Sequence, residues 1–335
     1  MLFRSVVSLA GAAEVVVEKQ GRLSGSELHL WLDVVKTAAA EKPAASAGPD
    51  LSRVRPSRLL AVSMVEADAE QVSVRTDRME VWFRTIAAAP IVADPGRPQP
   101  SPTTAPQTPV PQPVQPAPAA PADAAGRGTM LATAGLVRGL VLMGPAGGHL
   151  EELSMEGQVH LVEQPRPGGP PADQQPGLDI RGDQLQLTRA QTADARAIVS
   201  GRPAKAQGRG LDLEGPLVEF DRGRNRLAVD GAGRLAIPVA AGAGGLDAFS
   251  VTAAPKPAPR AAADGPPGRL DVTWQGRLDF DGQTARFMDR VVATNGAAQM
   301  QSGSLDVIFS KPFEFGAGSR AGPQPDVARI ACGSG

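Results

Sequence analysis

The sequence has few of the side chains on which most enzymes and metal sites depend. Among its 335 residues there are one cysteine, three histidines and no tyrosine. The single cysteine, Cys332, excludes an internal disulfide and a cysteine metal cluster. His29, His149 and His160 have no further ligand at a matching spacing, so we expect them to face solvent. The sequence therefore predicts neither a metal nor a cofactor.

Charge and aromatic content argue against a nucleic-acid partner. The net charge is -1, and aromatic residues make up only 4% of the chain. A basic surface is the usual electrostatic footprint of a nucleic-acid-binding protein, and base stacking needs aromatic platforms. We expect no nucleic-acid binding.

No apolar run approaches the ~18 residues of a membrane-spanning helix. At the start of the chain, Val6 to Ala10 is shorter than the ~7–15 apolar residues of a signal peptide. We expect the chain to be a fragment that is open at both ends. Any signal or anchor would then lie outside it.

The motifs of the common enzyme classes are missing. There is no G-x-S-x-G elbow, Walker A loop, zincin helix or CxxC pair. Three carboxylates lie close in sequence, at Asp279, Asp281 and Asp289. Asp279 lies on the polar phase of a strand, and Asp281 with Gly282 forms a hairpin signal. We therefore predict that the protein is not an enzyme.

Alternating apolar and polar residues dominate the stretch 177–238, around which the rest of the chain is organised. Period-two alternation places the apolar side chains of a strand on one face. Short strands separated by glycines or charged turns are typical of an all-β protein. Asp221 to Asn225 reads as a hairpin loop, with Gly223 able to take a positive φ.

Similar strand patterns recur elsewhere, separated by segments rich in proline, alanine and glycine. Prolines crowd the stretch from Pro95 to Pro121, which we expect to stay extended and unpacked. Whether this insertion divides two rolls or leaves and re-enters a single one stays open. The predicted organisation is an N-terminal β-roll part (1–94), a Pro-rich linker (95–127), β-roll repeats (128–239), an Ala/Gly/Pro linker (240–268) and C-terminal β-roll repeats (269–335).

Ser200 to Leu235 resembles a known repeat. It contains Gly201-Arg202-Pro203-Ala204, then Gly215 to Asp221, then Asn225 to Gly231. These match, in order, the "G-x-P-A", "G-x-x-h-x-h-D" and "N-x-h-x-h-x-G" strands of the OstA-like family, which contains lipopolysaccharide-transport proteins of the LptA and LptC type. The similarity covers about sixty residues and rests on rhythm rather than on an invariant site.

The resemblance implies an antiparallel β-jellyroll or β-taco, two sheets bent into a V with apolar inner faces. It implies a periplasmic or cell-envelope protein that shields the acyl chains of lipopolysaccharide or another glycolipid, with an inner-membrane anchor in a missing N-terminal segment. Other β-roll components would add at the unpaired edge strands. The residues expected to line the groove are Leu185, Leu187, Val218, Phe220, Leu227, Val229, Leu235, Ile237, Leu278, Phe280, Val307 and Phe309.

A different function fits the same alternation. In a structural or adhesive β-repeat scaffold, the inward residues would pack as a core and no ligand would enter. Groove geometry separates the two hypotheses. An apolar cleft as wide as an acyl chain favours transport, whereas side chains that meet across the two sheets favour a scaffold.

Overall fold

A computed structural model describes most of the predicted strand regions. The described residues are 4–17, 21–34, 54–69, 72–86, 129–144, 147–164, 177–190, 192–208, 211–239, 268–296, 298–312 and 327–333. The Pro-rich linker and nearly all of the linker 240–268 lie outside them. The strands are β1 (Arg4–Val17), β2 (Gly21–Val34), β3 (Val54–Asp68), β4 (Val72–Thr85), β5 (Thr129–Gly144), β6 (Gly147–Gln164), β7 (Asp179–Thr188), β8 (Arg196–Gly208), β9 (Leu211–Asp221), β10 (Arg226–Asp230), β11 (Gly233–Val239), β12 (Gly268–Trp274), β13 (Arg277–Phe280), β14 (Thr284–Asn295), β15 (Ala298–Phe309) and β16 (Val327–Gly333).

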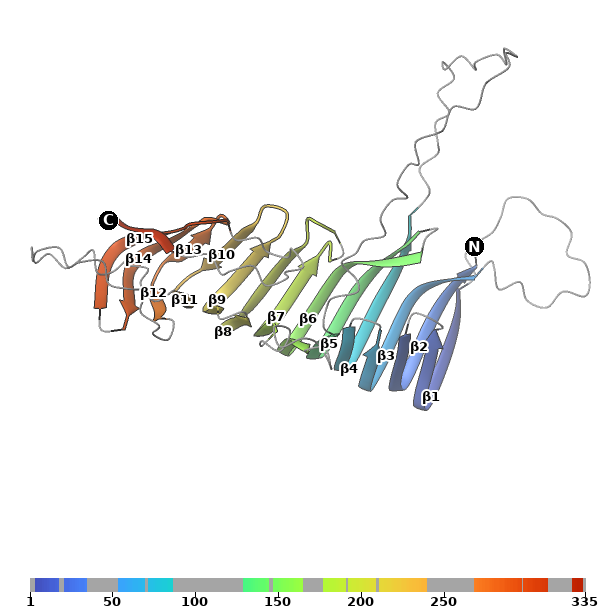
Figure 1. Cartoon of the computed structure of the whole chain (residues 1–335). Helices are drawn as coiled ribbons and strands as arrows, with labels where there is room; N and C mark the ends of the chain where they lie inside the picture. Colours follow the sequence, from blue (N-terminus) through green and yellow to red (C-terminus); the bar gives the residue numbers. More distant parts are fainter. Residues whose placement is uncertain are drawn as a thin grey trace, which may run out of the picture.

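All sixteen strands belong to one sheet, in which neighbours in sequence are mostly neighbours in space. The strands lie side by side from β1 at one end to β16 at the other (Figure 1). The predicted all-β, antiparallel architecture is confirmed, with one exception: β4 and β5 run parallel. Parallel neighbours need a crossover of about a dozen residues or more, and the segment 87–128 is long enough. Pairing of β4 with β5 makes the sheet continuous across the Pro-rich insertion.

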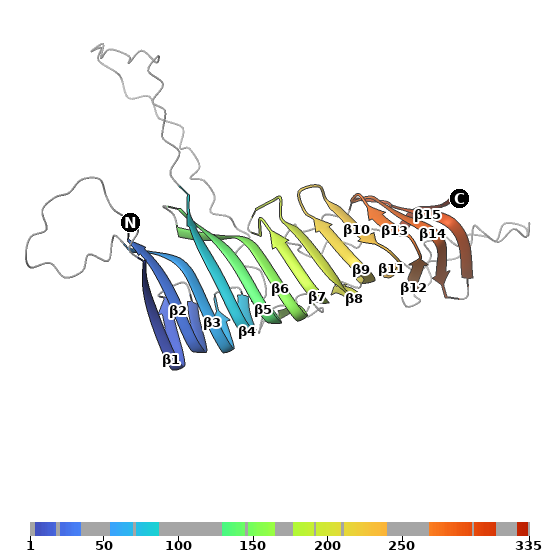
Figure 2. The ribbon, with the colours of Figure 1, turned by 180° about the vertical axis from the view of Figure 1, so that it is seen from behind.

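The long strands bend midway, and the bends align across the sheet into what we call the fold line. Register shifts mark it, for example between Ala10 and Ala13 on β1 and between Val62 and Val65 on β3. Residue pairs with positive φ occupy these shifts at Gly11–Ala12, Ser63–Met64, Gly157–Gln158 and Asp289–Arg290. A β-bulge bends its strand and increases the local twist. Repeated bulges therefore fold the sheet into two walls, and the bent strands are visible from both sides (Figure 1, Figure 2).

The prediction of short strands was wrong for most of the sheet. β6, for example, has 18 residues and continues through Gly157. Gly157 has a φ of 81° and forms a bulge instead of a turn. β10 and β11 likewise follow one another along β9, with a bend near Gly231, because β9 pairs with both strands.

The hairpin predicted at Asp221–Asn225 is present between β9 and β10. Its positive-φ residue is Asn225, at 50°, and not Gly223. Asparagine tolerates this left-handed conformation better than most residues. The Asp221 carboxylate accepts a hydrogen bond from the Arg224 N–H at 2.9 Å, which closes the loop.

Three rows of inward side chains run across the strands in register, two on the first wall and one on the second. The first inner row is Leu9, Leu28, Ala61, Met79, Val137, Met155, Leu185, Val199, Val218, Val229, Leu278, Phe287 and Leu305. The second is Val7, Leu30, Leu59, Val81, Gly139, Leu153, Leu187, Ala197, Phe220, Leu227, Phe280, Ala285, Val307 and Ile330. The third, on the opposite wall, is Val15, Leu23, Ala67, Val74, Ala132, Leu161, Ile180, Ala206, Leu213, Leu235, Val272, Ala293 and Met300.

Candidate functional site

The candidate site is the space between the two walls, lined by the three inner rows. Every side chain in these rows is apolar, and none carries a charge. Period-two alternation explains this composition, because each row collects the same phase of successive strands. Such a surface can bind only an apolar ligand, or it can pack against itself.

The predicted groove residues belong to the three inner rows, except Ile237 and Phe309, which lie on the same strand phase two residues beyond Leu235 and Val307. Most of them are buried. Phe220, Phe309 and Leu187 are partly buried against the core cluster. The others have exposed fractions of 9% or less, namely Leu185, Val218, Leu227, Val229, Leu235, Ile237, Leu278, Phe280 and Val307. Contact between these residues and a lipid stays a prediction, and it would require the two walls to separate there.

Exposure changes along the second inner row, which is half-buried apart from Gly139 from β2 through β9 and buried from β10 through β15, whereas the first inner row is buried from Leu28 on β2 onward. In the second inner row, Leu30, Leu59 and Val81 are half-buried, whereas Leu227 is 4% and Val307 1% exposed. The third inner row goes from half-buried Leu23 and Val74 to buried residues on β11, β12 and β14, and ends at half-buried Met300 on β15. We call β2–β6 the open section and β10–β15 the closed section.

Aromatic side chains fill the closed section. The Trp274 ring lies 5.2 Å from that of Phe287, and Phe280 meets Phe309 edge-on at 5.8 Å. Trp274 donates a hydrogen bond from its indole N–H to the Gly231 carbonyl at 3.0 Å. Gly233 makes room for the indole, because a Cβ there would lie 2.4 Å from a ring carbon. Large rings in close contact pack the two walls together here, at the density typical of a protein interior.

Small residues lie near the fold line of the open section. Ala61, Ala132 and Ala134 are buried, and Gly139 takes a place in the second inner row. Half-buried aliphatic side chains surround them on both walls. The inner face of the open section is therefore apolar, with buried small residues and half-buried aliphatic ones.

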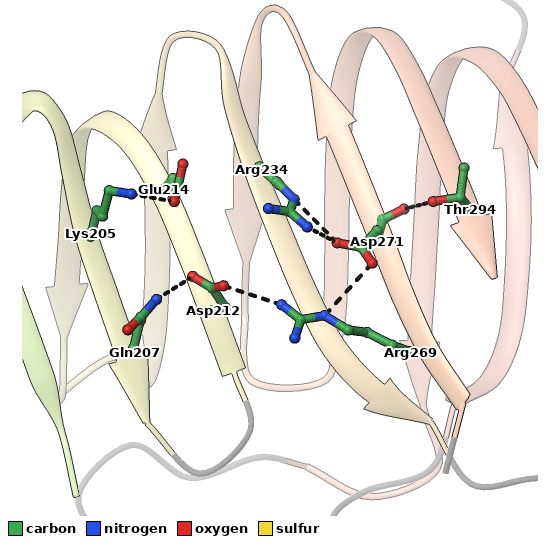
Figure 3. A network of polar contacts seen from close by, with 8 residues as sticks. All are labelled: Lys205, Gln207, Asp212, Glu214, Arg234, Arg269, Asp271 and Thr294. Carbon is green, nitrogen blue, oxygen red and sulfur yellow. Dashed lines mark hydrogen bonds and ion pairs between the residues drawn. The ribbon is translucent and has the colours of Figure 1, made fainter. Parts of the chain in front are cut away.

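The outer faces carry paired charges instead. On the outside of the second wall, Arg234 pairs with Asp271 at 2.5 Å, and Arg269 lies between Asp271 and Asp212 (Figure 3). Lys205 pairs with Glu214 at 2.7 Å beside them (Figure 3). Opposite charges on adjacent strands stabilise a sheet modestly. These charged pairs indicate that the outer face of the second wall is exposed to solvent.

The first wall has a similar outer pattern over the closed section. Arg226 and Arg277 both approach Asp279, at 2.6 and 2.8 Å. Arg286 pairs with Asp306 at 3.0 Å. Asp279, the first of the three carboxylates singled out in the sequence, thus pairs with two guanidinium groups on the outer face. The prediction that it is not catalytic stays a prediction.

Two aspartates have lowered pKa values for structural reasons. Burial raises the pKa of Asp281, but hydrogen bonds from the backbone N–H groups of Thr284 and Gln283 outweigh it. Burial also opposes ionisation of Asp179, yet the hydrogen bond from Arg181 and the neighbouring His160 lower its pKa on balance. Both groups hold a turn or a strand pair in place and lie away from the inner rows.

An aromatic ladder on the outer face of the open section was not predicted. The Arg58 guanidinium lies 5.0 Å from the Trp31 ring and 5.6 Å from the Trp82 ring, on three adjacent strands. Glu80 is 7% exposed and accepts hydrogen bonds from Arg58 and Arg78. The sequence signal is weak, because Arg58 and Trp82 meet only through the β3–β4 register.

The histidines are separate from one another. His29 lies 3.0 Å from the Ser8 hydroxyl, and His160 lies 3.2 Å from Asp179. His149 is half-buried on β6. Within the described ranges, no group of three or more histidine, cysteine or carboxylate side chains is placed to hold a metal ion.

No protein-family model matches this sequence, and no curated protein is similar to it. The resemblance to the OstA-like family therefore stays a prediction. The part of the chain that the structure describes contains no helix long and apolar enough to cross a membrane.

Proposed function

We propose that this protein binds the acyl chains of lipopolysaccharide or another glycolipid between its two walls and shields them from water during outer-membrane biogenesis. The observation that carries the proposal is the uncharged inner surface of the open section, where aliphatic side chains keep part of their surface exposed. Each methylene moved from water into such a surface contributes ~0.8 kcal/mol. Arginine–aspartate pairs lie on the outer faces of both walls, so the apolar face of the sheet is the inner one.

The proposal places the protein in the periplasm or cell envelope, where such lipids have to cross an aqueous space. Other β-roll components would be its protein partners. Within the described residues, β1 pairs on one side only, with β2, and β16 only with β15. Strands with one free edge can add a strand from a partner.

A scaffold function has support from a different observation. In the closed section most inner residues of both walls are buried, as in an ordinary core, and half-buried Met300 and Phe309 on β15 are exceptions. A packed core of this kind is sufficient for a structural or adhesive β-repeat. The scaffold hypothesis requires the open section to be empty of ligand as well.

Native mass spectrometry of the purified full-length chain separates these functions. We expect a glycolipid adduct, either co-purified or formed on addition of lipopolysaccharide. Val81→Asp should abolish the adduct, because it places a carboxylate on the inner face of the open section. Val62→Asp is the matched control, since Val62 lies opposite Arg78 on the outer face.

The control should keep the adduct and both variants should keep the strand signal in circular dichroism. A folded wild-type protein that carries no lipid and ignores added lipopolysaccharide would reject transport and favour the scaffold.

A further inference from the structure

The outer face of the open section differs from the outer face of the closed section. It carries the outer aromatic ladder, in which the guanidinium of Arg58 lies 5.0 Å from the ring of Trp31 and 5.6 Å from that of Trp82. Over the closed section the outer face carries arginine–aspartate pairs instead. Two of the chain's three tryptophans therefore lie half-buried on the outside of the sheet, beside Val6, which is 49% exposed.

The ladder is preorganised and presents hydrogen-bond donors. Glu80 is 7% exposed and accepts a hydrogen bond from Arg58 at 3.3 Å, which holds the guanidinium between the rings. Among the described residues, neither Trp31 nor Trp82 donates its indole N–H to an acceptor, whereas Trp274 does. A ligand that suits this surface has apolar faces for the rings and acceptors for the indole N–H groups.

A proline-rich polypeptide has this chemistry, and the chain contains one. The stretch 95–121, which lies outside the described residues, has Arg97 as its only charged residue. Proline-rich sequences favour polyproline II, whose carbonyl groups make no internal hydrogen bonds and remain available as acceptors. Segments of this kind dock against aromatic surfaces, and they lose little conformational entropy because they are extended before they bind.

The spacing of the ladder matches the repeat of such a segment. Trp31 on β2 and Trp82 on β4 are two strand spacings apart, which is about 9.6 Å. One turn of polyproline II is three residues of ~3.1 Å each, which is about 9.3 Å. Prolines three residues apart therefore recur on one face at the separation of the two rings. The stretch contains such pairs at Pro106 and Pro109 and at Pro113 and Pro116.

The connection of the strands brings the stretch to the ladder. Segment 87–128 begins just after β4 ends at Thr85 and finishes where β5 begins at Thr129. Because β4 and β5 are parallel, the segment has to return along the length of this strand pair. The residues 87–94 reach up to ~26 Å, whereas the strand between Thr85 and Trp82 covers only ~10 Å. The stretch is therefore long enough to lie on the ladder.

We propose that the proline-rich stretch 95–121 docks across the outer aromatic ladder, with a Pro-x-x-Pro pair on the rings of Trp31 and Trp82. The contact is intramolecular, so the effective concentration of the stretch is on the order of millimolar and a low intrinsic affinity is sufficient. The inference goes beyond the proposed function and does not rest on lipid binding. It revises the expectation that this stretch stays unpacked.

The indole N–H signals in 15N-edited NMR spectra of the full-length chain test the docking. Three tryptophans give three signals, which Trp31→Phe and Trp82→Phe assign. Replacement of residues 95–121 by a Gly/Ser sequence of the same length should shift the signals of Trp31 and Trp82 and leave that of Trp274 in place. The matched control replaces residues 240–266, which are equally long, and should shift none of them. Unchanged signals of Trp31 and Trp82, or an equal shift of Trp274, would overturn the inference.

A nitroxide spin label in the stretch shows which chain supplies the occupant. Gln112→Cys carries the label in a Cys332→Ser background, because Cys332 is the chain's only cysteine. We expect the label to broaden the indole signals of Trp31 and Trp82 and not that of Trp274. A mixture of 15N-labelled wild-type chain with spin-labelled, isotopically unlabelled chain should show no broadening. Broadening in the mixture would assign the ladder to the stretch of a second copy, and no broadening in either sample would reject the docking. Neither readout involves lipid, so failure here leaves the proposed function intact.

Discussion

Replacing Trp274 with alanine lowers the free energy of unfolding by about 3–5 kcal/mol, the usual cost of removing a large buried aromatic side chain. Trp274 is 1% exposed and packs on Phe287 across the two walls. The substitution also leaves the Gly231 carbonyl without its indole donor. Chemical denaturation followed by circular dichroism measures the change.

Trp82→Ala is the matched control. Trp82 lies on the outer face, is half-buried and stacks on Arg58. Exposed cation–π contacts contribute about 0.5–1 kcal/mol, so this variant should lose much less stability than Trp274→Ala. Equal losses for the two tryptophans would contradict the assignment of Trp274 to the contact that joins the walls.

An aspartate at Val307 destabilises the protein far more than an aspartate at Val81. Both valines lie in the second inner row and differ mainly in exposure. Val307 is 1% exposed in the closed section, so a carboxylate there would be buried without a partner. We expect a loss of about 4 kcal/mol or more at Val307. At half-buried Val81, water still reaches the new group, and about 1–2 kcal/mol is expected.

Thermal or denaturant unfolding of the two variants provides the comparison. If Val81→Asp proved as damaging as Val307→Asp, the open section would be a closed core like the rest of the sheet. If both were mild, the walls of the closed section would separate easily.

The inward phase of the strands could be predicted from the sequence. Alternation alone placed Leu185, Val218 and Leu278 on one face, and the register brings them into one row. A strand's phase is a local property, so a single sequence contains it. The hairpins at Asp221–Asn225 and Asp281–Gly282 are equally local.

Burial could not be predicted in the same way. Phe220 and Val229 look alike in the alternation, yet Phe220 is half-buried and Val229 is 0% exposed. The two residues lie in different rows, because Val229 belongs to the first inner row, nearer the fold line, and Phe220 to the second. The position of the fold line depends on bulges, which the alternation does not reveal. Glycine signals were also ambiguous, because Gly157 continues its strand through a bulge whereas Gly282 lies in a turn.

The contacts of the outer aromatic ladder could not be predicted either, because they depend on how distant strands pair. Trp31, Arg58 and Trp82 are spread over three strands, and no short motif connects them. Their contact follows from the pairing of β2 with β3 and of β3 with β4. A long strand with an internal bulge changes register partway, so the sequence did not indicate which residues would meet.

The most direct test of the central claim is the chemical accessibility of the inner face, with and without lipid. Single cysteines at Val81 and Val307, each in a Cys332→Ser background, would be labelled with a maleimide on the folded full-length chain. We predict that the cysteine at position 81 reacts, that added lipopolysaccharide protects it, and that the cysteine at position 307 stays unreactive in both conditions. Equal reactivity at the two positions, or no protection at position 81, would contradict binding of acyl chains on the inner face of the open section.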